Sequence, residues 1–187
     1  MLREPPIKTQ TSFEEFLEFE STSQVRHEFV DGNLFVMAGG TDRHNLIALT
    51  LMMLIFRSAQ ESGFYALNDV LLKTPSGQGY YPDLYVVPHL GEAEARVKRH
   101  PHIIIEVLSE STEAIDRGEK WQAYQQIPSL QQYILLSQRE PLAETFVRHD
   151  SQWLYSKLGN DDVLRLPSLQ CEIILSSLYE NLPLLES

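Results

Sequence analysis

The sequence contains very little cysteine. Cys171 is the single cysteine among 187 residues. One cysteine cannot form an intramolecular disulfide, and such a composition is typical of a reducing compartment. The first ten residues lack the apolar core of a secretory signal peptide. We therefore expect a soluble, cytoplasmic protein.

Long hydrophobic runs are also missing. The longest apolar-rich stretch, residues 46–56, is interrupted by Thr50, and it is much shorter than the ~20 residues that a transmembrane helix needs. Repeats and low-complexity tracts are absent as well. With 187 residues and 43% hydrophobic composition, the chain should form one globular domain, with residues 1–10 as a loose arm. No membrane partner is expected.

Positive charge is scarce. The chain has 15 Lys and Arg against 26 Asp and Glu, which gives a formal net charge of -11. This balance argues against indiscriminate nucleic-acid binding, which depends on neutralising phosphates. A local basic patch is still present at 96–102, where Arg96, Lys98 and Arg99 are candidates for contacting nucleic acid. The alternative is a solvated loop that happens to be charged.

Turn and cap residues divide the N-terminal half into elements. Residues 12–19 predict a short acidic helix. The pair Asp31 and Gly32, between two apolar runs, predicts a two-residue hairpin. A long helix is expected over 43–62, ending at Gly63. Its apolar residues lie most of the way around the helix axis, which predicts that the helix is well buried.

The rest of the sequence predicts strands mixed with one more helix. Strands are expected at residues 64–72, 80–87, 102–108, 133–136, 144–148 and 153–157. The helix should start near Asp116 and end before Pro128. The apolar tail at 169–179 should pack on the core. Helices mixed with consecutive hairpins indicate a mixed α/β, or α+β, fold.

Two carboxylates stand inside apolar strands, Asp83 in Tyr-Pro-Asp and Glu106 in Ile-Glu-Val. A buried strand tolerates a charge only where the charge is paired or binds a metal. If strands 80–87 and 102–108 form a symmetric antiparallel hairpin, the two acids lie opposite each other, with Cβ atoms about 4.5–5.5 Å apart. Acids that close repel unless a cation intervenes, and a hard divalent ion suits them.

A competing interpretation gives the two acids ordinary roles. Asp83 would simply be solvated after Pro82, and Glu106 would pair with Arg99 or Arg117. A register shift of one residue would also send one carboxylate to the other face of the sheet. Charges are rare in strand interiors, and for this reason we favour the metal site.

The helix that follows Glu106 supplies a cation. Asp116, Lys120 and Tyr124 recur at intervals of four residues and share one helix face. A short loop could bring this face over the carboxylates. Lys120 could then orient the attacking water or stabilise the charge that develops on phosphorus. The alternative is an exposed helix surface carrying Glu119 and Lys120.

Two further polar residues complete the candidate site. Glu28 lies in an apolar hairpin strand, and His44 lies in the first turn of the long helix. A lone histidine at a helix start is more often a surface or satisfied residue. Glu28 and His44 are therefore candidates only in combination with Asp83 and Glu106.

Four segments resemble a known family. They are HEFVDGNLFVMAGG, YYPDLYVVP, HIIIEVLSESTEAIDRGEK and YQQIPSLQQYILL. Together they resemble the Uma family of restriction-endonuclease-like proteins, which is abundant in cyanobacteria and assigned to the PD-(D/E)XK nuclease superfamily. The resemblance covers about residues 13–179, and its most specific part is E-V-L-S at 106–109 followed by Asp116 and Lys120. It implies a restriction-endonuclease-like core, with a mixed central sheet flanked by helices.

The resemblance also implies the metal ligands. Asp83 and Glu106 match the motif acids, and the Val107 carbonyl matches the usual backbone ligand of Mg²⁺ or Mn²⁺. The plain motif has a lysine two residues after the second acid, where this chain has Leu108. In this family the lysine has moved to the following helix, and Lys120 matches it.

The resemblance further implies which residues surround the metal site and which reaction the protein catalyses. Glu28 and His44 match positions that are commonly polar in the family and would border the metal site. The implied function is a Mg²⁺- or Mn²⁺-dependent endonuclease that hydrolyses phosphodiester bonds of DNA. A homodimer is compatible with this function, since many nucleases of the superfamily pair to cut both strands.

Two alternatives stay open. One is a catalytically inactive nuclease-fold module that binds nucleic acid or protein, which would bind no divalent ion. The other is a glycosidase, because acid pairs about 5–5.5 Å apart also serve retaining sugar hydrolysis. Tyr80 and Tyr81 would then line the sugar cleft.

Overall fold

The computed structural model describes residues 3–37, 39–90, 96–180 and 182. The helical segments are α1 (Phe13–Thr22), α2 (Asp42–Glu61), α3 (Glu113–Ile115), the π-helical turn η1 (Asp116–Lys120), α4 (Trp121–Tyr124) and the 3-10 turns η2 (Pro167–Leu169) and η3 (Leu175–Leu178). The strands are β1 (His27–Val30), β2 (Asn33–Val36), β3 (Tyr65–Leu67), β4 (Leu71–Lys73), β5 (Gly79–Tyr80), β6 (Leu84–Val87), β7 (Val97–Lys98), β8 (Ile103–Leu108), β9 (Gln132–Ser137), β10 (Ala143–His149), β11 (Gln152–Leu158), β12 (Val163–Leu166) and β13 (Cys171–Ile174). In this part of the chain no helix is long and apolar enough to cross a membrane.

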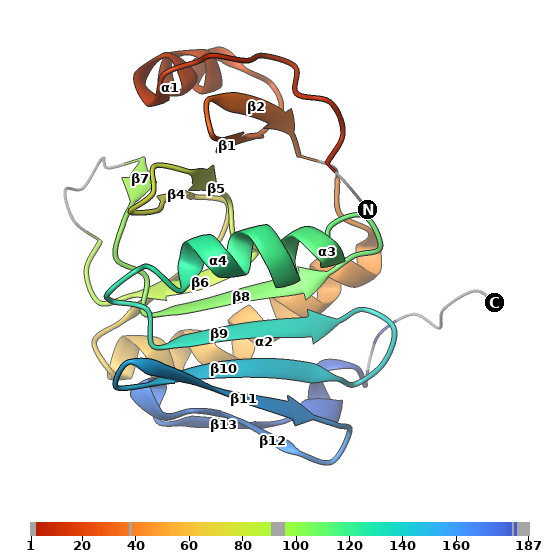
Figure 1. Cartoon of the computed structure of the whole chain (residues 1–187). Helices are drawn as coiled ribbons and strands as arrows, with labels where there is room; N and C mark the ends of the chain where they lie inside the picture. The colour runs from red at the N-terminus through yellow and green to blue at the C-terminus, as the bar shows by residue number, and fades with distance from the viewer. Residues whose placement is uncertain (1–2, 38, 91–95, 181, 183–187) are drawn as a thin grey trace.

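The central sheet has the strand order β11-β10-β9-β8-β6-β3. Its strands pair antiparallel except β8 and β9, which run parallel, so the sheet is mixed as predicted. Strand side chains alternate between two cores. Those that face α2 are Leu84, Val86, Ile103, Ile105, Val107, Ile134 and Leu136, and those that face α4 are Tyr85, Val87, Ile104, Leu108, Tyr133 and Leu135. Figure 1 shows α2 behind this sheet and α3–α4 in front of it.

A second sheet, of order β2-β1-β5-β4-β7, lies above α4 in Figure 1. Helix α1 packs on it through Phe13 and Phe16, whose rings lie 5.4 Å from the ring of Phe29. The β1–β2 hairpin turns at Asp31 (φ 48°) and Gly32 (φ 77°). Positive φ at both central residues is the mark of a type I′ turn, and the predicted hairpin is confirmed.

The arm at the start of the chain is bound to the second sheet. The Ile7 N–H donates to the Leu34 carbonyl at 2.9 Å, and the Leu34 N–H donates to the Lys8 carbonyl at 2.9 Å. The prediction of a loose arm is therefore wrong for the described residues of this segment. The physical reason is that β2 has an open edge, whose N–H and C=O groups are satisfied by the arm.

Two predicted strands are each divided between the two sheets. Residues 64–72 form β3 in the central sheet and β4 in the second sheet, separated at Asp69, whose φ is 53°. Residues 80–87 form β5 and β6, separated at Pro82. Proline has no N–H to donate to a ladder, so the strand ends there. Asp83 therefore lies where the chain crosses from one sheet to the other.

Helix α2 begins and ends close to the predicted residues, but its burial differs. Thr41 caps it by accepting from the His44 N–H at 3.2 Å. The residues that it buries are Ile47, Leu51, Ile55 and Ala59. Met53, on the opposite side, is 72% exposed. The prediction of an all-round buried helix is wrong for the single chain, because the sheet and the tail cover only one side.

The segment from β12 to η3 packs behind the central sheet, as predicted for the tail. β12 was not predicted; it pairs with β13 in an antiparallel hairpin. Leu164, Ile173 and Leu178 join the core beneath α2. This hairpin and α2 therefore close one face of the sheet, and the opposite face is left to the helix that carries Lys120.

Candidate active site

The register of β6 and β8 places the two motif acids across from each other. The ladder pairs Leu84 with Ile105, and its continuation pairs Asp83 with Glu106. Two hydrogen bonds fix this end of the ladder. The Asp83 N–H donates to Glu106 Oε2 at 3.2 Å, and the Val107 N–H donates to Asp83 Oδ2 at 2.7 Å. The predicted antiparallel arrangement of the two strands is confirmed.

Lys120 lies at the end of the π-helical turn η1 and points toward the carboxylates. Its Nζ is 3.1 Å from Glu106 Oε1, 3.0 Å from Asp116 Oδ1 and 3.3 Å from Glu28 Oε1. The residue is 5% exposed, so the alternative of an exposed lysine is wrong. π-Helical turns inside helices are frequent at functional sites. Here the turn and the four-residue spacing place Asp116 and Lys120 over the sheet together.

Glu106 is buried, and both of its carboxylate oxygens have hydrogen-bond partners. It is 2% exposed, and its Oε1 also accepts from the Tyr124 hydroxyl at 3.1 Å. Burial raises the pKa of Glu106 well above its usual value, and the Lys120 ammonium partly offsets this shift. For Lys120, burial opposes the charged form, but Asp116, Glu106 and Glu28 outweigh burial and raise its pKa. The cluster therefore holds a compact buried ion network.

Arg99 and Arg117, the alternative partners predicted for Glu106, do not pair with it. Arg117 pairs with Glu113 and Glu144, and Arg99 lies in an exposed position. Lys120 is the cation beside Glu106 instead. The interpretation in which Glu106 pairs with Arg99 or Arg117 is thus wrong.

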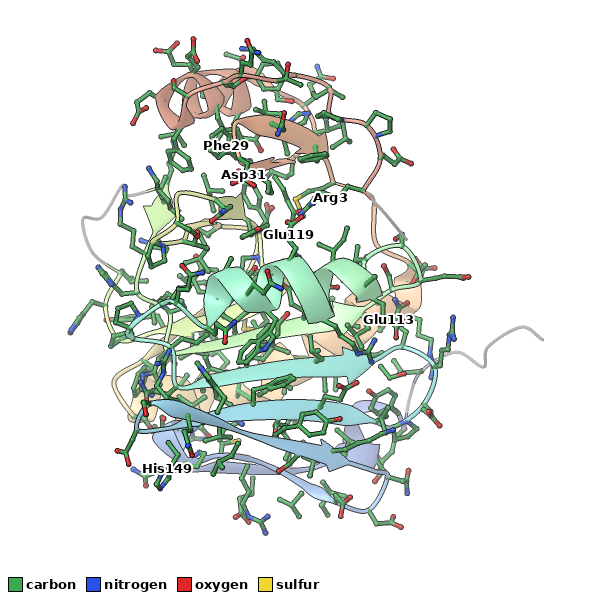
Figure 2. The ribbon with its side chains drawn as sticks, in the orientation of Figure 1. Arg3, Phe29, Asp31, Glu113, Glu119 and His149 are labelled. Carbon is green, nitrogen blue, oxygen red and sulfur yellow. The ribbon has the colours of Figure 1, made fainter. Side chains whose placement is uncertain are left out.

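Arg3 forms an outer layer of the cluster that sequence reasoning missed. Its guanidinium contacts Glu28 Oε2 and Glu119 Oε1, each at 2.7 Å. The Tyr80 hydroxyl donates to the same Glu119 oxygen at 3.0 Å. Figure 2 shows Arg3 and Glu119 approaching each other between the β1–β2 hairpin and α4. Tyr80 is fully buried, which does not fit a sugar cleft lined by this ring.

His44 joins the cluster from the α2 side. Its Nε2 lies 3.0 Å from Asp83 Oδ2. Burial opposes protonation of His44, but the hydrogen bond and charge of Asp83 outweigh it and raise the His44 pKa. Both residues line a cavity of about 370 Å³ together with Leu49, Met52 and other side chains. Glu106 is not among the lining residues, so only Asp83 of the two motif acids opens directly to this cavity.

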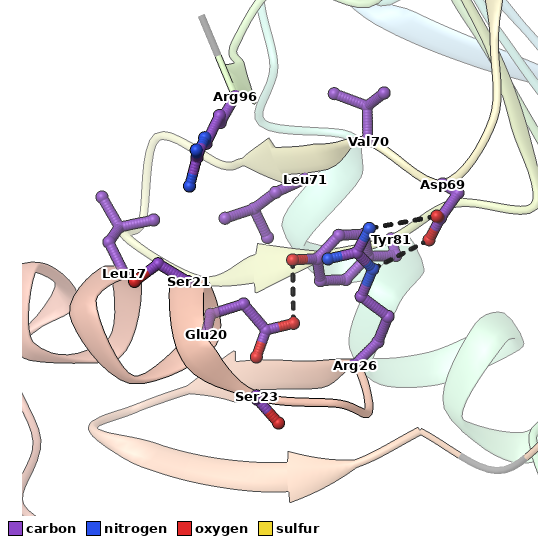
Figure 3. Close-up of a pocket in the computed structure, with 10 residues that line it drawn as sticks. All are labelled: Leu17, Glu20, Ser21, Ser23, Arg26, Asp69, Val70, Leu71, Tyr81 and Arg96. Carbon is purple, nitrogen blue, oxygen red and sulfur yellow. Dashed lines mark hydrogen bonds and ion pairs between the residues drawn. The ribbon is translucent and has the colours of Figure 1, made fainter.

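A second cavity of about 370 Å³ adjoins the first, because Asp69 and Tyr81 line both. Arg26 binds the two carboxylate oxygens of Asp69 at 3.0 and 3.1 Å, and its guanidinium lies 5.1 Å from the centre of the Tyr81 ring. Figure 3 shows Arg96 at the rim of this cavity, on the other side of Leu71. The second cavity is therefore lined by two arginines, Arg26 and Arg96, and it shares Asp69 and Tyr81 with the cavity of Asp83.

Only one residue of the predicted basic patch lines the second cavity, and this residue is Arg96. Lys98 lies in β7 and donates to the Leu90 carbonyl instead, and Arg99 is exposed outside the cavity lining. Arg26 was missed because an arginine beside a strand carries no recognisable pattern until Asp69 and Tyr81 are seen beside it.

The charges of the cluster favour a cation. Five carboxylates, those of Glu28, Asp83, Glu106, Asp116 and Glu119, surround the site. Arg3 and Lys120 supply two positive charges, so five minus two leaves three net negative charges when all five carboxyl groups are ionised and His44 is neutral. Like charges at these separations repel unless a further positive charge is present.

The donors fit a small divalent ion. The contacts of the Asp83 carboxylate with His44 and with the Val107 N–H are made by Oδ2, and Asp83 lines the cavity. The Val107 N–H donates to Asp83 Oδ2 at 2.7 Å, which places the backbone of Val107 beside this carboxylate. In the residues that the structure describes, no group of three His, Cys, Asp or Glu side chains is poised to hold a metal. Mg²⁺ commonly binds only one or two carboxylates and keeps several waters.

The mixed sheet between helices, with acids on paired strands and a lysine on the next helix, defines a nuclease-like fold. The chain belongs to the Uma2 family, whose model, described as "Putative restriction endonuclease", matches residues 13–177. The uncharacterized protein slr1290 of Synechocystis sp. PCC 6803 is 30% identical over 174 residues, covering 90% of this chain and 91% of that protein. A second Synechocystis protein, sll1609, is 29% identical over 154 residues, covering 79% and 87%.

A solved structure has the same fold. The crystal structure of a "putative nuclease belonging to DUF820" from Anabaena variabilis ATCC 29413 matches with a TM-score of 0.75 at 16% sequence identity. The match covers 90% of this chain and 97% of that one. At this identity the likeness establishes the fold, and the chemistry must be argued from the residues of this chain.

Proposed function

We propose that this protein is a Mg²⁺- or Mn²⁺-dependent endonuclease that hydrolyses phosphodiester bonds of DNA. The observation that carries the proposal is the pairing of Asp83 with Glu106 across β6 and β8, with the Lys120 ammonium 3.1 Å from Glu106. Asp83, Glu106 and the Val107 carbonyl would hold the ion. The bound ion would supply a Lewis acid that activates water and neutralises charge on the leaving oxygen.

The other residues of the cluster position these ligands. Lys120 and Tyr124 donate to the same oxygen of Glu106 and fix the direction of its carboxylate. Lys120 also places a positive charge beside the site, where it would stabilise the additional negative charge of the transition state. His44 holds Asp83 from the cavity side. Glu28 contacts Lys120, and Arg3 in turn contacts Glu28.

A catalytically inactive binding module is the second candidate, and one observation favours it. Every carboxylate oxygen of Glu106 already has a partner in the chain, and the side chain is 2% exposed. A site that has lost its metal could keep this closed network. The two candidates differ in one measurable property, because only the nuclease requires the ion.

The first prediction tests catalysis directly. At low salt with Mn²⁺, the protein should nick or linearise plasmid DNA, and chelation should stop it. Asp83→Asn should lower the cleavage rate at least about 10³-fold, comparable to the loss of other strong electrostatic contributions to a transition state. The rate should be followed by gel electrophoresis of supercoiled plasmid.

The matched control is Asp161→Asn, which removes an equal charge from an exposed position. It should cleave at the parental rate. Cleavage by the parent that does not depend on Asp83 would indicate a contaminant or another site. Absence of both metal binding and cleavage, across plasmid and single-stranded substrates, would favour the inactive module.

The second prediction concerns the second cavity, which shares Asp69 and Tyr81 with the cavity of Asp83. Arg26 and Arg96 line this second cavity, and we propose that the two arginines contact phosphates that flank the cut site. Each alanine substitution should weaken binding to a duplex oligonucleotide and reduce the slope of log K against log salt by about 0.9 per lost phosphate contact. Fluorescence anisotropy at several salt concentrations measures both quantities.

Arg165→Ala is the matched control. Arg165, like Arg26, is an exposed arginine paired with one acid, here Glu172 at 3.1 Å, but it lies on the tail hairpin. Its substitution should leave the salt slope unchanged. Equal losses for Arg165 and Arg26 would show that only the overall charge matters.

A further inference from the structure

Helix α2 carries an apolar stripe on its outward side. The stripe consists of Leu46, Leu49, Met53 and Phe56, which are 38%, 55%, 72% and 47% exposed. Their spacing of three, four and three residues is the a/d spacing of a coiled-coil seam. The buried residues of α2, such as Ile47, Leu51 and Ile55, point to the opposite side. Such a contiguous row of large apolar side chains facing solvent on a 20-residue helix is typical of an interaction surface.

We propose that the α2 stripe is a twofold interface in which α2 packs antiparallel against α2 of a second copy of this chain. The sequence of the stripe is self-complementary about residue 51. In an antiparallel pair, Leu46 meets the partner subunit's Phe56, and Leu49 meets the partner subunit's Met53. Every contact then pairs an a position with a d position. An isologous dimer needs this property, because the same patch must fit itself after a twofold rotation.

The size of the stripe agrees with a dimer. The four stripe residues and the neighbouring Leu54, which is 42% exposed, leave about half of each side chain open to solvent. A large apolar side chain exposes on the order of 200 Å² when free, so the patch amounts to roughly 500 Å². A standard interface buries about 800 Å² per partner with a polar rim around its apolar centre. The polar residues beside the stripe would supply that rim.

The antiparallel orientation is also the favourable one electrostatically. The N-terminal end of each helix carries partial positive charge and the C-terminal end partial negative charge. Antiparallel packing places these opposite ends together, whereas parallel packing places like ends together. Leu49 also lines the cavity that holds His44 and Asp83, so the partner's Met53 would lie beside the mouth of that cavity. The interface itself requires no nuclease activity.

Cysteine cross-linking tests both the interface and its direction. Cys171 is the single cysteine of the chain, so Cys171→Ser gives a clean background. Two variants are made in it, Leu46→Cys and Phe56→Cys. In the proposed dimer each residue is about 15 Å along the axis from its own copy in the partner. A mixture of the two variants should therefore cross-link with a short bismaleimide, whereas each variant alone should cross-link at least 10-fold less.

Either of two results would overturn the proposal. Cross-linking of each variant alone at the level of the mixture would indicate parallel packing or random collision. No cross-linking in the mixture at micromolar protein would mean that the stripe does not pair with itself.

Sedimentation equilibrium gives an independent measure. The parent should be a dimer at micromolar concentration, and Leu49→Lys with Met53→Lys should shift it to monomer without loss of helical content. Leu154→Lys is the matched control, since Leu154 is 53% exposed, like Leu49, but lies on β11. It should remain dimeric. A parent that is monomeric at these concentrations, or a Leu154→Lys variant that dissociates as fully, would contradict the α2 interface.

Discussion

Replacing Lys120 with methionine is expected to lower the free energy of unfolding by about 3–5 kcal/mol, as when one partner of a buried ion pair is removed. Lys120 contacts Glu28, Glu106 and Asp116 within 3.3 Å and is 5% exposed. Methionine fills a similar volume but leaves these carboxylates without their shared cation. Urea denaturation of the metal-free protein measures the loss, which should appear as a lower midpoint with an unchanged slope.

The charge-matched double variant separates electrostatics from packing. Adding Glu106→Gln to Lys120→Met removes one of the uncompensated charges and should recover part of the lost stability. Lys157→Met, at an exposed position of β11, is the surface control and should change stability by less than about 0.5 kcal/mol. If Lys120→Met costs no more than Lys157→Met, Lys120 is not a buried counter-ion of this cluster.

The pair Asp83 and Glu106 was predictable because the information that places it is local. The two strands are close in sequence, and strand periodicity of two fixes which side chains share a face. Lys120 was predictable for a similar reason, since the four-residue period of a helix aligns it with Asp116 and Tyr124. Their contacts with Glu106 follow from these two periods and one short connection.

Arg3 could not be predicted, because its partners are distant in the chain. Its contact with Glu119 spans 116 residues, and nothing in the local sequence shows that the arm will lie on β2. The crossing of the chain between sheets at Asp69 and Pro82 was missed for the same reason. The sequence predicts a single strand for each segment, and only the tertiary arrangement shows that each serves two sheets.

The burial of α2 shows what a hydrophobic pattern can and cannot determine. Apolar residues such as Met53 and Ile55 on opposite sides predict a helix covered all round, and the single chain covers only the Ile55 side. A hydrophobic pattern does not distinguish side chains that are buried within one chain from side chains that are buried between two chains. A second copy on the stripe would reconcile the sequence with the structure.

Millimolar Mn²⁺ is expected to raise the melting temperature by several degrees. The cluster carries three net negative charges when all five carboxyl groups are ionised and His44 is neutral, so an ion that binds the folded state relieves repulsion that the unfolded chain does not have. At one hundred times its Kd, such a ligand adds about 2.7 kcal/mol to the free energy of unfolding. For a domain of this size, ~1 kcal/mol corresponds to about 2–4 °C. Differential scanning calorimetry with and without the ion measures the shift.

The double variant Asp83→Asn with Glu106→Gln should abolish this shift, because it removes both side-chain ligands. Without metal it should be as stable as the parent or more stable, since two repelling charges are gone. Asp150→Asn with Glu140→Gln removes the same charge from exposed positions and should keep the full Mn²⁺ response. If the ion shifts the parent and the Asp83/Glu106 variant equally, it binds elsewhere, and the proposed mechanism loses its main physical support.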